Sequence, residues 1–180
     1  GLTEMSNFSA QIKINASKGQ VWAVLSDLGS IYKWNPGVAH SYSTSESSGG
    51  EGATRHCDIR TPLKGYLEER AFDWREGESF KIDIYDTNFP LKRNVVQFSL
   101  RTDGSDTVVE VSPEYQLKFG ALGAVMDRLA FNRQFRKGMT GLLTGLKYYV
   151  ETGEEVIDRV PTQEGGSRQQ RSGSNHPASN

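Results

Sequence analysis

The chain has 180 residues, of which 36% are hydrophobic and 24% charged, and its formal net charge is -1. This length allows one domain with a sizeable core. The near-neutral charge provides no overall field for nucleic acid or an acidic membrane surface, and no apolar run approaches the roughly 18 residues of a membrane span. The first residues lack the regions of a signal peptide. Cys57 is the only cysteine, so we expect no disulfide and a cytoplasmic location.

The composition divides the chain into three parts. We interpret residues 1–5 as an N-terminal remnant, with Met5 as the natural start. Residues 6–152 carry the periodic apolar patterns of one folded domain. Residues 153–180 are rich in Ser, Gly, Gln and Asn and have little to bury, which predicts a disordered tail.

One strand and two short helices begin the domain. Apolar and polar residues alternate over residues 8–14, which predicts a half-buried strand. Ser17 is then a suitable N-cap, and Gln20 completes the spacing of a capping box. The helix that follows is expected to end near Gly29. A second helical piece covers residues 31–34, before a proline stops it.

About six further strands follow, joined by turns. Their expected ranges are 38–46, 53–60, 65–75, 79–86, 93–102 and 107–119. So many strands joined by short turns tend to curl, which predicts a strongly curved antiparallel sheet. One conflict concerns Phe72 and Trp74, which alternation turns away from the core. This orientation is costly for two large aromatics unless a bulge shifts the register.

The last long segment, residues 121–151, is predicted to be a helix with a divided apolar stripe. In its N-terminal half, Asn132 lies near the centre of the stripe, with Arg128 and Arg136 close by. The C-terminal half is apolar there. We therefore expect residues 139–150 to seal a core and residues 125–136 to roof a cavity. Asn132 would be the polar contact, or it would bond to strand backbone.

Three glycines, Gly138, Gly141 and Gly145, line one edge of this predicted helix. Each costs about 1 kcal/mol relative to alanine in a helix interior. We expect them to mark the closest approach of the sheet backbone.

Common catalytic and metal-binding motifs are absent from the sequence. It contains no GxSxG, P-loop or HExxH pattern. His40 and His56 belong to one predicted hairpin, but folding about its central glycines places His56 near Thr44. We therefore expect no metal site and no cofactor.

A set of motifs over residues 5–152 carries a family resemblance. They are Val21-Trp22, Leu25, Asp27, Tyr32, Trp34, Pro36, Gly52-Ala53-x-Arg55, Glu69-Arg70 and Phe89-Pro90-Leu91, followed by the long helix. With these, the chain resembles the START-like (SRPBCC) superfamily, in particular its polyketide cyclase/dehydrase and lipid-transport branch. The resemblance implies an α+β helix-grip fold. In that fold a curved antiparallel sheet of about seven strands wraps around the C-terminal helix, two short helices follow strand 1, and a ligand cavity lies between sheet and helix.

Candidate ligand-binding residues follow from strand alternation, with the resemblance placing these rows inside. The strands supply Arg55, Cys57, Ile59, Glu69, Ile82, Ile84, Asn94, Val96 and Phe98. The cavity entrance and the long helix supply Trp34, Arg128, Asn132 and Phe135. We favour an ion pair between Glu69 and Arg55 over direct ligand contact, because an unpaired buried charge is costly.

These observations favour binding of a hydrophobic small molecule, such as a lipid, polyketide or isoprenoid, for transport or sequestration. One alternative is an aromatase/cyclase or dehydratase that uses Glu69, Tyr42 or an arginine to move a proton. No acid and base pair stands out in the sequence, so we favour binding over catalysis. A second alternative is a protein-interaction module that acts through its surface or tail. The residues do not fix an oligomeric state.

Overall fold

The computed structural model describes residues 6–60, 64–118 and 124–156, with side chains from Phe8 onward and, in the last segment, from Leu129 onward. The predicted N-terminal remnant and residues 157–180 of the predicted tail lie outside the described residues. Residues 153–156 follow the last helix, and Val156 is buried.

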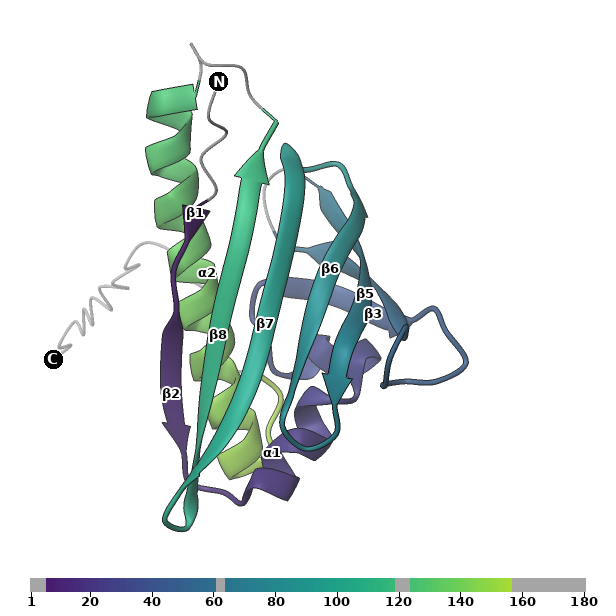
Figure 1. Cartoon of the computed structure of the whole chain (residues 1–180), viewed down its shortest axis with the longest axis vertical. Helices are drawn as coiled ribbons and strands as arrows, with labels where there is room; N and C mark the ends of the chain where they lie inside the picture. Colours follow the sequence, from purple (N-terminus) through teal and green to yellow (C-terminus); the bar gives the residue numbers. More distant parts are fainter. Residues whose placement is uncertain (1–5, 61–63, 119–123, 157–180) are drawn as a thin grey trace, which may run out of the picture.

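One antiparallel sheet curves around a long helix (Figure 1). Its strands are β1 (Ser6–Asn7), β2 (Ala10–Ile14), β3 (Val38–Ser43), β4 (Thr54–Ile59), β5 (Gly65–Arg75), β6 (Ser79–Thr87), β7 (Leu91–Asp103) and β8 (Asp106–Leu117). The helices are α1 (Lys18–Leu25), the 3-10 helix η1 (Leu28–Lys33) and α2 (Ala124–Thr152).

The strands from β3 to β8 pair with their sequence neighbours, while β1 and β2 both pair with β8 at one edge. The sheet therefore has seven strand positions. The helix α2 packs on β2 and β8, and the strands from β6 to β3 curve round toward its other side (Figure 1). Register shifts within β3, β5 and β7 interrupt the pairing, and irregularities of this kind increase local twist. This is the helix-grip arrangement that the family resemblance implied.

A register shift in β5 resolves the predicted conflict between its two aromatics. Asp73 has a φ of 48°, in the left-handed region that β-strands do not use. The chain therefore breaks its alternation there, and Trp74 turns to the core side. Its ring stacks on Phe80 at 4.8 Å between centroids and meets Trp22 edge-on. Phe72, before the shift, keeps the outward orientation that alternation predicts.

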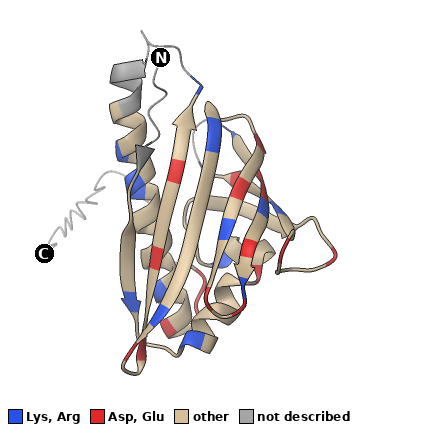
Figure 2. Ribbon diagram, viewed as in Figure 1, with Lys and Arg blue, Asp and Glu red and all other residues tan. Residues whose placement is uncertain are grey.

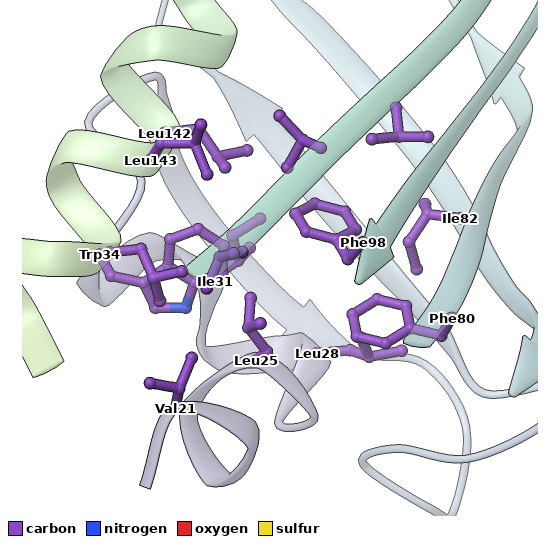
Figure 3. Packing of buried hydrophobic residues seen from close by; sticks show 14 of the residues in the cluster. Val21, Leu25, Leu28, Ile31, Trp34, Phe80, Ile82, Phe98, Leu142 and Leu143 are labelled. Atoms are coloured by element: carbon purple, nitrogen blue, oxygen red, sulfur yellow. The ribbon is translucent and has the colours of Figure 1, made fainter. Parts of the chain in front are cut away.

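The short helices close one end of the curved sheet. Ser17 caps α1 and forms the predicted capping box with Gln20. Buried side chains of α1, η1, the strands and the C-terminal half of α2 form one core. Figure 3 shows Trp34 in this core, among Ile31 and Leu143.

The glycines of α2 mark an approach to the η1–β3 connection rather than to the sheet. A Cβ on Gly145 would lie 2.0 Å from the carbonyl oxygen of Trp34, whereas one on Gly141 would meet only Pro36, at 3.8 Å. A Cβ on Gly138 would meet nothing within 4 Å. The prediction that all three approach the sheet backbone is therefore wrong, because a loop between helix and sheet fills that space.

Charged residues of both signs are interspersed over the sheet (Figure 2). His56 and His40 lie on the hairpin of β3 and β4, where His56 pairs with Tyr42 rather than near Thr44 as predicted. The described residues contain no cluster of three or more His, Cys, Asp or Glu suited to a metal ion. Among them, no helix is long and apolar enough to cross a membrane.

Candidate ligand cavity

A cavity lies between the concave face of the sheet and the middle of α2. Its inner part has a volume of about 100 Å³. Ten of the predicted ligand-binding residues line it, namely Arg55, Cys57, Ile59, Glu69, Ile82, Ile84, Asn94, Val96, Phe98 and Phe135. Alternation positions the nine strand residues because each strand turns every second side chain inward, and β4 to β7 do so at the same level, while Phe135 comes from α2.

An outer part with a volume of about 260 Å³ adjoins the inner one. The two parts share eight lining residues, which are Asn35, Val38, Ile59, Leu67, Ile84, Asn94, Phe135 and Met139. The outer part is also lined by Gln134 and Gly138, which are exposed on α2, and by Phe89 and Leu91 at the start of β7. The cavity therefore leads from the core toward the surface beside α2.

The inner wall carries a compact ion pair. Arg55 Nε donates to Glu69 Oε1 at 3.0 Å, and its Nη1 donates to the carbonyl of Leu28 at 3.2 Å. The Cys57 thiol donates to the same carboxylate oxygen at 3.4 Å. Burial is the largest single effect and lowers the pKa of Arg55, but the charge of Glu69, the interaction with Cys57 and the hydrogen bond to Glu69 together raise this pKa above its ordinary value. Burial, and then the Glu69 charge, raise the pKa of Cys57, so the thiol stays protonated. The predicted pairing of Arg55 with Glu69 is confirmed.

Asn94 is the other buried polar residue on the wall. Its side chain is 3% exposed and lines both parts of the cavity. The Oδ1 atom is buried and accepts no hydrogen bond from the described residues. Buried amide oxygens in folded proteins normally have a hydrogen-bond partner. Asn94 differs in this respect from Arg55 and Glu69, which form a hydrogen bond with each other.

Three of the predicted residues are not on the described cavity wall. Trp34 is 2% exposed and packs in the core, so its predicted position at the entrance is wrong. It follows η1 in the chain, and the helix end turns its ring inward. Asn132 is half-buried and accepts a hydrogen bond from the hydroxyl of Tyr115 on β8. Its predicted role as the polar contact of the cavity is wrong, and it bonds to a strand side chain instead. The side chain of Arg128 lies outside the described residues.

The cavity wall also includes residues that the sequence analysis did not select. Phe131, Gly138 and Leu142 are such residues, and together with the predicted Phe135 they follow one another along α2 at intervals of four, three and four residues. This spacing places them on one face of a helix. Their face is displaced by about one residue from the stripe centred on Asn132. Leu67 shares the inward face of β5 with Glu69, as strand alternation predicts.

A family model described as polyketide cyclase / dehydrase and lipid transport matches residues 5–151. The chain belongs to this family. The match spans the whole sheet and nearly all of α2, so the cavity lies inside the matched region. The predicted recognition of the START-like branch is confirmed. No curated protein gives a significant match to the chain.

Solved structures of START-like and aromatase/cyclase proteins share the fold. The Zhui aromatase/cyclase from Streptomyces sp. R1128 aligns with a TM-score of 0.72 at 12% identity, covering 82% of this chain and 94% of that one. A START superfamily protein from Mycobacterium smegmatis has a TM-score of 0.65 at 16% identity, over 81% and 97% of the two chains. A protein from Thermus thermophilus has a TM-score of 0.70 at 16% identity, over 82% and 99%. At these identities the similarity concerns the fold.

Proposed function

We propose that the chain binds a hydrophobic small molecule in the cavity between the sheet and α2, for transport or sequestration. The observation that carries this proposal is the composition of the wall. Aliphatic and aromatic side chains from β4 to β7 and α2 form most of it, and few polar groups interrupt them. Sites of this kind derive their affinity from apolar burial and their orientation from a few polar atoms.

The dimensions support a small ligand. The outer part, of about 260 Å³, is close to the lower end of the roughly 300–1,000 Å³ range of small-molecule pockets. A single chain or a compact ring system fits this scale better than a lipid with two long chains. The family description includes lipid transport, which agrees with a single-chain lipid, a polyketide or an isoprenoid.

The ion pair supports binding over catalysis. A catalytic Glu69 would have to exchange a proton with a substrate, and because its Oε1 already accepts from Arg55 and Cys57, this role would fall to Oε2. In the same pair, the Arg55 guanidinium is engaged by the Glu69 carboxylate. The cyclase alternative therefore draws its support from the family description and from the fold of the Zhui enzyme.

A blocking variant tests the proposal. Gly138 lies at the outer cavity, and a side chain there would meet nothing within 4 Å, so Gly138→Phe should fill the cavity while the fold stays intact. The matched control is Gly138→Ala, which adds a single methyl group. We expect a neutral apolar ligand such as para-hexylanisole to bind the natural chain and Gly138→Ala, and to bind Gly138→Phe at least about tenfold more weakly.

Calorimetric titration measures the three affinities, and thermal unfolding checks that each variant folds. Native mass spectrometry of the chain purified from its own host provides a second readout, in which a co-purifying apolar molecule is expected. A panel of apolar ligands that binds none of the three proteins would overturn the proposal. Equal binding to Gly138→Phe and Gly138→Ala would move the site away from this cavity.

A further inference from the structure

We propose that the ligand is uncharged and donates a hydrogen bond, from a hydroxyl or an equivalent N–H group, to Oδ1 of Asn94. This inference rests on the proposed function and specifies the class of ligand. An alcohol or a phenol with an apolar body belongs to this class, whereas a fatty acid or a phosphorylated isoprenoid does not.

The first argument is the state of the Asn94 amide. Asn94 lines the cavity, and its Oδ1 is buried with no hydrogen-bond donor among the described residues. A candidate donor on the neighbouring strand is Tyr115, which pairs directly with Asn94 between β7 and β8. The Tyr115 hydroxyl has one proton and donates it to Asn132. An acceptor in this position discriminates strongly for a donor, because a ligand without one leaves the oxygen desolvated and unpaired.

The second argument is the charge balance of the wall. Among the described residues that line the cavity, Arg55 and Glu69 are the charged ones, and they form an ion pair at 3.0 Å. Their charges cancel, and the guanidinium also donates to the Leu28 carbonyl. A carboxylate or phosphate in the cavity would therefore add an uncompensated buried charge, which is costly. A neutral donor brings no such penalty.

The third argument is the position of Asn94 along the cavity. It lines both the inner and the outer part. Phe98 and Leu142 lie on the inner part, and Phe131 lies on the outer part. A ligand that extends through both parts therefore meets Asn94 at the junction between two apolar regions. The donor group is expected within the body of the ligand or on a ring, with apolar atoms on both sides.

A series of three matched ligands tests the inference. Para-hexylphenol carries a donor, para-hexylanisole has the same shape with its oxygen methylated, and para-hexylbenzoate carries an anionic group. We expect the natural chain to bind the phenol about ten- to a hundredfold more tightly than the anisole or the benzoate. In Asn94→Leu the preference for the phenol over the anisole should disappear.

Gln97→Leu is the matched control, since Gln97 is an amide on β7 that alternates to the opposite face of the strand. This variant should keep the full preference. Equal binding of phenol and anisole to the natural chain would overturn the inference and leave the proposed function standing, and would indicate that water alone satisfies Asn94. Tightest binding of the benzoate, or a preference that survives Asn94→Leu, would also overturn it. If none of the three ligands binds, the proposed function itself fails.

Discussion

Arg55 and Glu69 face each other directly across β4 and β5, with the guanidinium Nε 3.0 Å from the carboxylate Oε1. Both side chains are almost fully buried. Strand register brings them together, since 14 residues separate them along the chain. Each charge depends on the other, because neither has bulk water to solvate it. The pair therefore contributes to both the stability of the sheet and the neutrality of the cavity.

Removal of one member of this pair should cost more stability than removal of both. Arg55→Met leaves the Glu69 carboxylate buried and unpaired, which we expect to lower the free energy of unfolding by about 3–5 kcal/mol. The double variant Arg55→Met/Glu69→Leu should recover most of this loss, because no charge stays behind. Urea unfolding measures the difference. A double variant that is less stable than Arg55→Met would contradict the expectation.

Two glycines of α2 should respond in opposite directions to the same substitution. Gly145→Ala places a Cβ against the Trp34 carbonyl oxygen, at 2.0 Å before any relaxation, so the helix must move and stability should fall. Gly138→Ala adds a methyl group in open space and should raise the free energy of unfolding by up to about 1 kcal/mol through helix propensity. Thermal unfolding of both variants provides the comparison. An equal effect of the two substitutions would show that the close contact with Trp34 is not rigid.

The thiol of Cys57 should be unreactive in the native chain. It is 1% exposed, and burial raises its pKa, so at about pH 8 the reactive thiolate is scarce. We expect an aromatic disulfide reagent to modify it slowly in the native state and fast in urea, with one thiol per chain since Cys57 is the only cysteine. Both rates are followed by the absorbance of the aromatic thiolate that the reagent releases. Native modification as fast as in urea would contradict its position on the inner wall.

His56 should make stability depend on pH near neutrality. Its ring bonds to Glu68 through Nδ1 and to Asp58 through Nε2. The hydrogen bond to Glu68 is the main cause that raises the pKa of His56, and burial acts against it. Because the folded-state pKa lies above the unfolded value of roughly 6.5, this contribution is complete below that pH. It is lost as pH rises through the folded-state pKa.

The variant His56→Gln isolates this contribution. Urea unfolding at a series of pH values should show the natural chain losing stability relative to the variant as pH rises above about 6.5. Parallel pH profiles for the two proteins would indicate that the imidazolium gains nothing from the neighbouring carboxylates.

Local patterns were sufficient for most of the elements. The predicted strand at residues 65–75 has the bounds of β5, and the capping box of Ser17 and Gln20 is present as expected. These features depend on residues close together in sequence, where alternation and cap chemistry act directly. That Arg55 and Cys57 share a face was predictable for the same reason, because a strand has only two faces, and the family resemblance implied that this face is the inner one.

The phase of α2 was not predictable in this way. A helix has no sharp division into two faces, and a displacement of one residue rotates a position by about 100°. The sequence pattern selected Asn132, but Tyr115 on β8 takes that side chain, and its ring also packs on Phe135. The cavity therefore receives the neighbouring face. Which face of an amphipathic helix borders a cavity depends on the partners that occupy the other faces.

The sequence by itself determined the helix-grip fold, the inward rows of the strands and the pairing of Arg55 with Glu69. The shared faces of the strands follow from a short-range period, and the pairing follows from the cost of burying an unpaired charge. The helix-grip fold and the inward direction of the rows were implied by the resemblance of the sequence motifs to a known family. The tertiary structure alone decided that Trp34 joins the core, that Gly145 touches a connecting loop, and that Asn94 Oδ1 stays unpaired at the cavity. These facts depend on where separate elements meet in space, and many different side chains at distant positions contribute to that packing.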